Sequence, residues 1–589
     1  MKKDNENIIS DSNMMICNTK LGEVVPNIAQ MLRRNADKFG NKIVFREKRD
    51  EKYIEITWNQ FYADISKIAS NLKKFGFNKG DKMVIFSRNR FEMLELELAI
   101  MAADGVAVPI FFNYSSETAE QLIQHSDAKF LTVGNTEQLD KIIRELPLKH
   151  IFIFNELSSA ELTSRRSKHK NLHPFSELLN ENKNSASSLN FDTHPDDICL
   201  NMYTSGTMGN EKCVQLSHKN ILSQQAAIQV TLNLDANDRF LSYLRWHHSF
   251  GGIFEIFGAL YNGASMTLES SLGTDPAEIL KNWKEIKPTV FFSVPLIYQA
   301  IIDLIAGDKK AEEEFFHPGL KFVFTAAAPL PKRISDEFEM RKIPVVEGYG
   351  LTETSPCCTL TDPEIKREPG VVGFPIPGVT IKLADDGEIL VKGPNIMKCY
   401  YKNDLANKDI FTDDGWFCTG DIGEITDSGL RLITRKDRIF KLLNAEKVIP
   451  TRIESSILKK CPYISYALVE GKGRNYPVAL LFPNHRLLDK TNNVNGDFPE
   501  CNCPEGISEL SGCLSHCLKE LNYNMNQKFS WIKAAMLVDD ELSIENKTLT
   551  PSLKLAPNNV KEFYKSHIEK LYGEDVKVVG NVYILPLDE

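Results

Sequence analysis

A loop rich in hydroxyls and glycines, with a lysine near its end, lies between Tyr203 and His218. Its sequence, YTSGTMGNEKCVQLSH, could direct backbone N–H groups, hydroxyls and one ammonium at a single anion, such as a nucleotide phosphate. A Walker loop is excluded, because Lys212 is followed by Cys213 where that motif has Ser or Thr opening a helix. The segment CVQLSH alternates like a strand, so we predict a strand–loop–strand element.

Further segments follow this loop in order and could complete a nucleotide site. They are GYGLTETSP, DGWFCTGDIG, RKDRIFKLLNAEKVIPTRIE and LTPSLKL, which begin at Gly348, Asp414, Arg435 and Leu549. Together with the loop they closely resemble the adenylate-forming superfamily of AMP-dependent synthetases and ligases, over nearly the whole chain. The segments LRWHHSFGGIFEIFGAL, TAAAPLP and LTPSLKL are most similar to those of long-chain fatty-acid–CoA ligases.

The resemblance implies an AMP-forming acyl-CoA synthetase that acts on a medium- to long-chain fatty acid. Such an enzyme converts the acid, ATP and CoA to acyl-CoA, AMP and diphosphate through an acyl-adenylate. ATP is consumed because a carboxylate is a poor electrophile. The protein must therefore hold a polyanion, balance its developing charge and place a carboxylate in line. The implied cofactors are ATP, Mg²⁺ and coenzyme A.

The resemblance also assigns the nucleotide ligands. The loop would wrap the β- and γ-phosphates, and AAAPL with GYG would form the adenine slot, where Tyr349 would stack on the base. Asp421 would accept from both ribose hydroxyls, with Arg435 as their second anchor. Glu353 would hold Mg²⁺, a hard cation that prefers oxygen ligands. The remaining cofactor-binding candidates are Thr204, Ser205, Gly206, Thr207, Gly209, Lys212, Ala327, Ala328, Pro329, Gly348, Gly350 and Lys441.

Three residues are candidates for catalysis by the same resemblance. His248 matches the segment beside the acyl carboxylate, although a core histidine is the alternative. Thr352 would contact the α-phosphate. Lys554 occupies the position of the adenylation lysine, which bridges the carboxylate and the α-phosphate as charge builds. Asp437 matches the hinge of a rotating C-terminal domain, which would present Lys554 for adenylation and then KLLNAEK to the pantetheine of CoA.

The chain departs from the family pattern near these residues. Glu211 and Cys213 stand where proline and glycine are usual, Ala445 replaces a glycine, and Pro557 replaces an arginine. Glu211 would mildly repel the polyphosphate, unless its side chain turns outward and is screened. Cys213 and Ala445 forfeit glycine's access to positive φ, which matters only where the position needs it. Every charged candidate remains, namely Lys212, Glu353, Asp421, Arg435 and Lys554. We therefore expect ATP binding, with a weakened or repurposed enzyme as the alternative.

Alternating helices and strands must position these residues. Residues 56–76 read as an amphipathic helix that ends at Gly76, with one apolar stripe of Phe61, Ile65, Ile68 and Leu72. Strand and helix then alternate through DKMVIFSRN, RFEMLELELAIMAADG and VAVPIF, and strands recur at PTVFFSVP, KFVFTAAAPL and IPVVEGYG. This order is typical of an α/β fold with a largely parallel sheet, in which ligands lie beyond the carboxyl ends of the strands.

The organisation changes beyond about residue 375, where strands are joined by tight turns such as Asp386-Gly387. We predict a large N-terminal domain of layered α/β sheets plus a small β-rich part, residues 1–436, which binds ATP and the acyl group. A small mobile α+β C-terminal domain, residues 437–589, would carry the adenylation lysine. Residues 158–172 are expected to be a solvated loop, and residues 489–506 an exposed insertion.

Composition limits the remaining classes of protein. A net charge of −9 argues against nucleic acid as a partner, and no segment approaches the roughly 20 apolar residues of a membrane span. Scattered cysteines suit a reducing cytosol. We expect a cytoplasmic protein without a secretory signal; peripheral contact at the inner face of the membrane and a homodimer stay open. Zinc bound by Cys501, Cys503, Cys513 and Cys517 is an alternative to free thiols.

Two rival functions stay open at this point. In the first, the acyl-adenylate is formed but the acyl group passes to an acyl-carrier protein or another thiol. In the second, the chain is a non-catalytic acyl- or nucleotide-binding protein with the same fold. Diphosphate release separates the second from the enzymes, and a CoA-dependent step separates the first from a CoA ligase.

Overall fold

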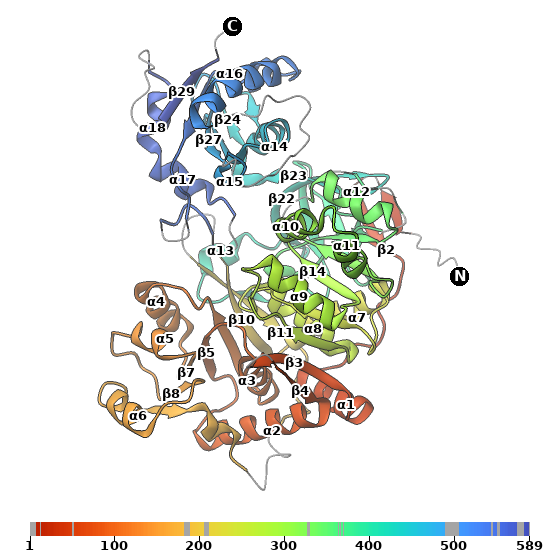
Figure 1. Ribbon diagram of the computed structural model, residues 1–589, viewed down its shortest axis with the longest axis vertical. Helices are drawn as coiled ribbons and strands as arrows, with labels where there is room; N and C mark the ends of the chain where they lie inside the picture. Colours follow the sequence, from red (N-terminus) through yellow and green to blue (C-terminus); the bar gives the residue numbers. More distant parts are fainter. Residues whose placement is uncertain are drawn as a thin grey trace.

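The computed structural model describes residues 7–11, 13–49, 52–181, 189–204, 211–326, 330–362, 365, 367–368, 370–488, 506–543, 546–550, 554–573 and 582–587. Two α/β sheets and an antiparallel sheet form the body of the molecule, and a C-terminal unit, blue in Figure 1, lies at one end. This arrangement confirms the predicted fold class of layered α/β sheets, a β-rich part and a small α+β unit.

The first α/β sheet contains the strands on both sides of the predicted phosphate loop. Its order is β21 (Cys399–Tyr400), β11 (Lys212–Ser217), β10 (Ile198–Thr204), β6 (Val106–Ile110), β5 (Lys82–Phe86), β7 (Phe130–Val133), β8 (His150–Ile153) and β9 (Leu172–Pro174). Neighbours from β10 to β9 are parallel, whereas β11 and β21 are antiparallel additions at one edge. The largely parallel sheet is thus confirmed, with an antiparallel edge at the loop.

The second α/β sheet contains the strands that precede the other predicted nucleotide motifs. Its order is β18 (Phe374–Pro375), β17 (Thr359–Leu360), β16 (Val345–Tyr349), β15 (Phe322–Thr325), β14 (Val290–Ser293), β12 (Arg239–Ser242), β13 (Ser265–Leu268), β3 (Ile43–Arg49) and β4 (Lys52–Thr57). The strands from β16 to β3 are parallel. The carboxyl ends of β15 and β16, where TAAAPLP and GYG begin, therefore lie side by side.

Helices bury their apolar faces against these sheets. The predicted helix at residues 56–76 forms as α2, and Phe61, Ile65, Ile68 and Leu72 are fully buried on it. The helix α3 is buried all round, because it packs on α1, α2 and the strand β6. The described helices of the body are α1 (Ile28–Phe39), α2 (Trp58–Lys74), α3 (Phe91–Ala102), α4 (Ser116–Ser126), α5 (Thr136–Asp140), α6 (Ser159–Arg166), α7 (His218–Leu232), α8 (Ile256–Asn262), α9 (Pro276–Ile286), α10 (Pro295–Ile305), α11 (Lys309–Phe315), α12 (Lys332–Met340) and α13 (Asp404–Lys408).

The antiparallel sheet is the β-rich part predicted after about residue 375. It runs in the order β1 (Asn7–Asp11), β2 (Met14–Cys17), β19 (Thr380–Leu383), β20 (Glu388–Lys392), β22 (Phe417–Thr426) and β23 (Gly429–Arg435). The predicted hairpin joins β19 to β20, and Gly387 takes the positive φ of 84° that its turn requires. This sheet leads the chain directly to the predicted hinge.

The C-terminal unit has hydrophobic cores of its own. The core of the body runs from Met15 to Leu430, and the C-terminal cores begin at Phe440. Separate cores are compatible with a boundary anywhere between these two, so the division at residue 437 stays a prediction. The elements here are β24 (Phe440–Lys441), β25 (Lys447–Val448), α14 (Pro450–Lys460), β26 (Ile464–Glu470), β27 (Val478–Pro483), α15 (His485–Leu488), α16 (Ile507–Tyr523), β28 (Ala534–Val538), α17 (Pro557–Phe563), α18 (Lys565–Lys570) and β29 (Val582–Pro586).

The segment at residues 158–172 differs from the predicted loop. Half of it forms the helix α6, which buries no residue. Ser158 and Glu161 form a reciprocal capping box at its start, and such a cap stabilises a short, mostly polar helix, of which Leu162 is partly buried. The prediction of a loop was therefore wrong, because half of the segment is helical. The prediction that the segment is solvated is confirmed for that helix, which has no buried residue. The predicted insertion at residues 489–506 lies, except for Gly506, outside the described residues.

None of the helices in the described part of the chain combines the length and the apolar character needed to cross a bilayer.

Candidate functional site

The predicted strand–loop–strand element is confirmed. The strands β10 and β11 pair antiparallel, and the last described pair before the loop is Thr204 opposite Lys212. The Thr204 hydroxyl donates to the Lys212 carbonyl at 3.4 Å, so these two candidates lie together at the mouth of the loop. The loop candidates Ser205, Gly206, Thr207 and Gly209 lie outside the described residues.

Glu211, one of the departures from the family pattern, is tied to the protein body. Its Oε1 accepts from the Tyr114 hydroxyl at 3.0 Å, and its Oε2 is buried without a partner among the described residues. Burial raises the pKa of Glu211 above its ordinary value, although the Tyr114 hydrogen bond opposes this. The Tyr114 hydrogen bond therefore holds one carboxylate oxygen of Glu211 against the protein body, a contact that the sequence did not indicate.

The two replaced glycines have different backbone conformations. Cys213 lies within β11 opposite Tyr203, is 1% exposed and does not have a positive φ. This position therefore does not need glycine's access to positive φ, because a strand residue is extended. Ala445 has a φ of +67°, so there the loss of glycine does place an L-residue in the left-handed region.

The ribose and adenine candidates meet through direct contacts. Asp421 pairs with Arg435 across β22 and β23, and the carboxylate Oδ1 lies 3.1 Å from the Arg435 guanidinium. Asp421 Oδ2 accepts from the Tyr349 hydroxyl at 2.8 Å. Burial raises the pKa of Asp421, although Arg435 and Tyr349 oppose this. Residues from three separate motifs therefore form one polar cluster.

The predicted adenine slot is described only in part. Tyr349 is 7% exposed, so little of its ring is available for a base to stack on. Gly348 precedes it within β16, and a Cβ on Gly350 would lie 1.8 Å from the Pro356 carbonyl oxygen, which only glycine avoids. Ala327, Ala328 and Pro329, the other predicted wall of the slot, lie outside the described residues.

Thr352 and Glu353 follow β16 on a short 3₁₀ turn, Thr352–Thr354. The Thr352 hydroxyl lies 3.0 Å from the Ser249 hydroxyl, which places the predicted α-phosphate contact next to the His248 segment. The Tyr400 hydroxyl donates to Glu353 Oε1 at 2.5 Å, and burial together with this carboxylate raises the pKa of Tyr400. Neither Ser249 nor Tyr400 was identified from the sequence, because only strand pairing and chain crossovers bring them here.

The surroundings of Glu353 suit a divalent cation of the Mg²⁺ type. Its Oε2 has no hydrogen-bond partner in the described part of the chain, and carboxylate oxygen is a ligand that Mg²⁺ prefers. The Lys212 ammonium lies 4.9 Å from the centre of the Tyr400 ring. The predicted phosphate ligand Lys212 and the predicted cation ligand Glu353 thus flank one tyrosine.

His248 and Lys554 influence each other across the two parts of the molecule. Both side chains are accessible to solvent, but enough protein lies around each of them to weaken its hydration. Loss of hydration lowers the pKa of His248 to about 4, with added repulsion from Lys554 and Arg245. Loss of hydration also lowers the pKa of Lys554, which Asp421 opposes and Arg435 enhances. The structure therefore brings Lys554 within electrostatic reach of the acyl and ribose candidates.

Lys441 and Pro557 are not drawn into this cluster, and Asp437 acts on it through its charge, which favours the charged form of Arg435. Lys441 is exposed in β24, and its carbonyl accepts from the Gly473 N–H at 2.9 Å. Asp437 is exposed in the turn Lys436–Arg438. Pro557 begins α17, where its missing N–H costs nothing. The roles expected for Lys441 and Asp437 stay predictions.

The predicted cysteine cluster is described in part. Cys513 and Cys517 share one face of α16, and their sulfurs lie 3.9 Å apart. Cys501 and Cys503 lie outside the described residues. Within the described ranges, no group of three or more potential ligands could hold a metal ion.

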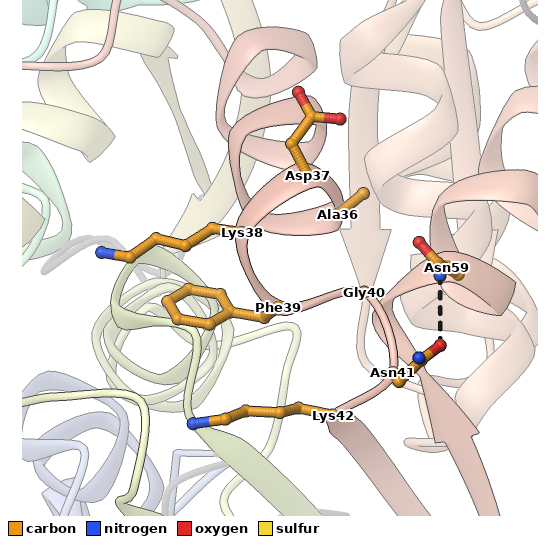
Figure 2. Close-up of a pocket in the computed structure, with 8 residues that line it drawn as sticks. All are labelled: Ala36, Asp37, Lys38, Phe39, Gly40, Asn41, Lys42 and Asn59. Carbon is orange, nitrogen blue, oxygen red and sulfur yellow. Dashed lines mark hydrogen bonds between the residues drawn. The ribbon is translucent and has the colours of Figure 1, made fainter.

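A surface hollow at the end of α1 lies apart from the candidates above. Figure 2 shows its lining, in which Lys38 and Lys42 extend on either side of the Phe39 ring and Asn59 donates to Asn41 at 3.4 Å. None of the predicted site residues contributes to this lining. The hollow is therefore not part of the candidate site.

Comparisons with known proteins agree over most of the chain. A family model described as AMP-binding enzyme matches residues 32–401, and one described as AMP-binding enzyme C-terminal domain matches residues 437–576. Long chain acyl-CoA synthetase 7, peroxisomal, of Arabidopsis thaliana is 26% identical over 585 residues, which cover 89% of this chain and 82% of that protein. Fatty acyl-CoA synthetase A of Dictyostelium discoideum is 27% identical over 616 residues, covering 92% and 90%.

Solved structures show the same fold. The O-succinylbenzoate coenzyme A synthetase of Bacillus subtilis, in complex with AMP, superimposes with a TM-score of 0.71. The comparison covers 91% of this chain and 98% of that one at 21% sequence identity. At this identity the likeness establishes the fold of both parts and nothing finer.

Proposed function

The chain belongs to the AMP-binding enzyme family, and we propose that it is an AMP-forming acyl-CoA synthetase acting on a medium- to long-chain fatty acid. One observation carries the proposal. Lys554 of the C-terminal unit lies within electrostatic reach of His248, Asp421 and Arg435 of the body. This is the grouping that acyl-adenylate formation needs, since a cation must sit between a carboxylate and an α-phosphate.

The first half-reaction forms the acyl-adenylate. A carboxylate oxygen attacks the α-phosphorus of ATP, a new O–P bond forms, and the bond to diphosphate breaks. Lys554 offsets the charge that gathers between the carboxylate and the α-phosphate, and Thr352 contacts the same phosphate. With a pKa of about 4, His248 is neutral at pH 7 and can hydrogen-bond the acyl carboxylate without adding charge. Mg²⁺, held by Glu353, would supply charge neutralisation on the phosphates.

The nucleoside would be held by the cluster at Asp421. Its carboxylate accepts from Tyr349 and pairs with Arg435, and each oxygen keeps a further lone pair for a ribose hydroxyl. The contact between Thr352 and Ser249 then sets the distance between the α-phosphate and the His248 segment. Direct bonds between these residues support a site organised before ATP arrives.

The second half-reaction transfers the acyl group to the CoA thiol. The sulfur attacks the acyl carbonyl, the carbon–sulfur bond forms, and AMP leaves with the carboxyl oxygen. Rotation about Asp437 would exchange Lys554 for the segment that contains Lys441 and Ala445. In support, the ion pairs on the two sides of Asp437 belong to different units. Lys436 pairs with Asp386 and Glu388 of the body. Arg438 pairs with Glu454 of the C-terminal unit.

A carboxylate panel tests this function. Purified protein, ATP and Mg²⁺ are incubated with acids of increasing chain length, and diphosphate release is measured with CoA, with acyl-carrier protein and without acceptor. We expect acid-dependent diphosphate release and formation of acyl-CoA with the longer acids. Thioester formation on carrier protein alone would favour the rival acceptor. Absence of diphosphate release with every acid would favour the non-catalytic alternative.

The remaining assignments are parts of the same proposal. They are the domain division at residues 436 and 437, the hinge at Asp437, the individual ligand roles and a cytoplasmic location. Each is separable from the activity itself, so a positive panel would not establish them.

A further inference from the structure

Tyr400 is held from both sides along its backbone. It lies in β21, which pairs antiparallel with β11 so that Tyr400 stands opposite Val214, two residues after Lys212. Its N–H donates to Asn407 Oδ1 at 2.8 Å, and Asn407 Nδ2 donates back to its carbonyl at 2.7 Å. The residue is 5% exposed. The strand pairing and the asparagine together fix where its ring and hydroxyl can lie.

The side chain of Tyr400 contacts two residues of the predicted site, Glu353 through its hydroxyl and Lys212 through its ring. Its hydroxyl donates to Glu353 Oε1 at 2.5 Å, and its ring lies 4.9 Å from the Lys212 ammonium. The backbone of Glu353 is fixed separately, because its carbonyl accepts from the Met397 N–H at 2.8 Å. Only the Glu353 side chain is left to be ordered, and the Tyr400 hydroxyl is its hydrogen-bond partner among the described residues.

We propose that Tyr400 is a positioning residue for the metal–nucleotide complex: it engages Glu353 Oε1, which leaves Oε2 for the divalent cation, and it holds Lys212 at the end of the phosphate loop. The proposal rests on the proposed function for the identity of the ligand, Mg²⁺ with ATP. Its physical basis is preorganisation, because a flexible carboxylate that is already oriented loses less conformational entropy when the cation binds.

The hydroxyl and the ring can be separated by mutation. Tyr400→Phe removes the hydrogen bond to Glu353 but keeps the ring beside Lys212. Tyr400→Leu removes both. Tyr401→Phe is the matched control, because the Tyr401 hydroxyl donates at 2.6 Å to the surface residue Asp127. ATP binding is measured by isothermal titration calorimetry at stepped Mg²⁺ concentrations, and diphosphate release is measured in parallel.

For Tyr400→Phe we expect the Mg²⁺ concentration that gives half-maximal ATP binding to rise by about tenfold, the usual scale for one hydrogen bond to a charged group. Affinity for ATP at saturating Mg²⁺ should change little. Tyr400→Leu should weaken ATP binding at saturating Mg²⁺ as well, and Tyr401→Phe should match the wild type. A role in packing alone would lower the fraction of active protein without moving the Mg²⁺ midpoint.

Two results would overturn the inference. One is a Tyr400→Phe protein with the wild-type Mg²⁺ midpoint, and the other is a Tyr401→Phe protein with an equal shift. Failure of the proposed function can be distinguished from failure of this inference. A wild-type protein that binds ATP with Mg²⁺ but releases no diphosphate would be non-catalytic. The shift of the Mg²⁺ midpoint in Tyr400→Phe would still decide the role of Tyr400. A wild-type protein that binds no ATP would overturn both.

Discussion

The two sides of the proposed site differ in how their residues are held. On the body, Tyr349, Asp421 and Arg435 contact one another directly, and Tyr400 contacts Glu353. On the C-terminal unit, the Lys554 side chain is exposed. Among the described residues its backbone bonds to Thr550: the Lys554 N–H donates to the Thr550 hydroxyl at 3.2 Å, and the Lys554 carbonyl accepts from the Thr550 N–H at 2.8 Å. The residues on the body are therefore positioned by bonds to one another before a ligand binds. The position of the Lys554 charge depends instead on how the C-terminal unit is oriented.

This contrast suggests a division of labour. A preorganised polar cluster is suited to a ligand that binds the same way in both half-reactions, such as a nucleotide. An exposed residue without bonds to the body can leave the site at little cost, as domain rotation requires. The predictions below test this contrast, beginning with the largest expected effect.

Removal of the Lys554 charge should separate the two half-reactions most strongly. Lys554→Ala should slow acyl-adenylate formation by roughly a hundredfold or more, the scale for loss of one preorganised charge. Thioester formation from preformed acyl-AMP should be largely spared. Diphosphate release and acyl-CoA formation are measured separately. Lys565→Ala, an exposed lysine on α18, is the control, and equal loss in both half-reactions would remove Lys554 from its proposed role.

A fixed hinge should affect one half-reaction more than the other. Asp437→Pro sets the φ of this residue near −65° and restricts rotation. We expect one half-reaction to fall by on the order of tenfold relative to the other, because a single domain orientation serves each. The same two assays measure the ratio, with Asp437→Ala as the control for loss of the carboxylate. A parallel fall in both rates would mean that the pivot lies elsewhere.

The pKa of the His248 imidazole should be low, because weak hydration and the charge of Lys554 both disfavour its protonation. Its lowered pKa of about 4 means that the imidazole is neutral above this pH, so its protonation should not reduce adenylation between pH 6 and 8. Because the unfolded state binds a proton more readily, this residue should add stability as pH rises from about 4 to about 6.5.

Nuclear magnetic resonance titration of the histidine ring tests this coupling. Removal of a neighbouring positive charge in Lys554→Ala should raise the pKa of His248 toward its ordinary value. Lys565→Ala again serves as the control. If the midpoint is the same in both variants and the wild type, Lys554 does not approach His248 in solution.

Glycine introduced at the two positions where the family usually has it should change the free energy of unfolding slightly and in opposite directions. Ala445→Gly should raise the free energy of unfolding of the C-terminal unit by about 1 kcal/mol, since it relieves a positive φ. Cys213→Gly should lower that of the body by about 1 kcal/mol or more, since it removes a buried side chain from a strand. Shifts of the urea unfolding midpoints measure both changes. Stabilisation by Cys213→Gly would contradict the strand assignment of this position.

The spacing of apolar residues along the chain was sufficient to predict individual helices and strands. The apolar stripe Phe61, Ile65, Ile68 and Leu72 has the period of a helix, and each of these residues is buried on α2. The alternation after Lys212 has the period of a strand, which is β11. Periodicity depends only on neighbours along the chain, and for that reason it is readable without a structure. The polar segment at residues 158–172 misled the prediction, because a capping box outweighed its composition.

The sequence by itself determined the order of the motifs and the residue types they contain, and hence the kind of reaction to expect. Tertiary structure alone decided which of them touch. Tyr400 and Glu353 are 47 positions apart, and Tyr114 and Glu211 are 97 positions apart. Such contacts depend on β21 joining the edge of the sheet beside β11 and on the path of each crossover. A hydrogen bond needs its partners within a fraction of an ångström, and only the packed sheets and helices set positions with that precision.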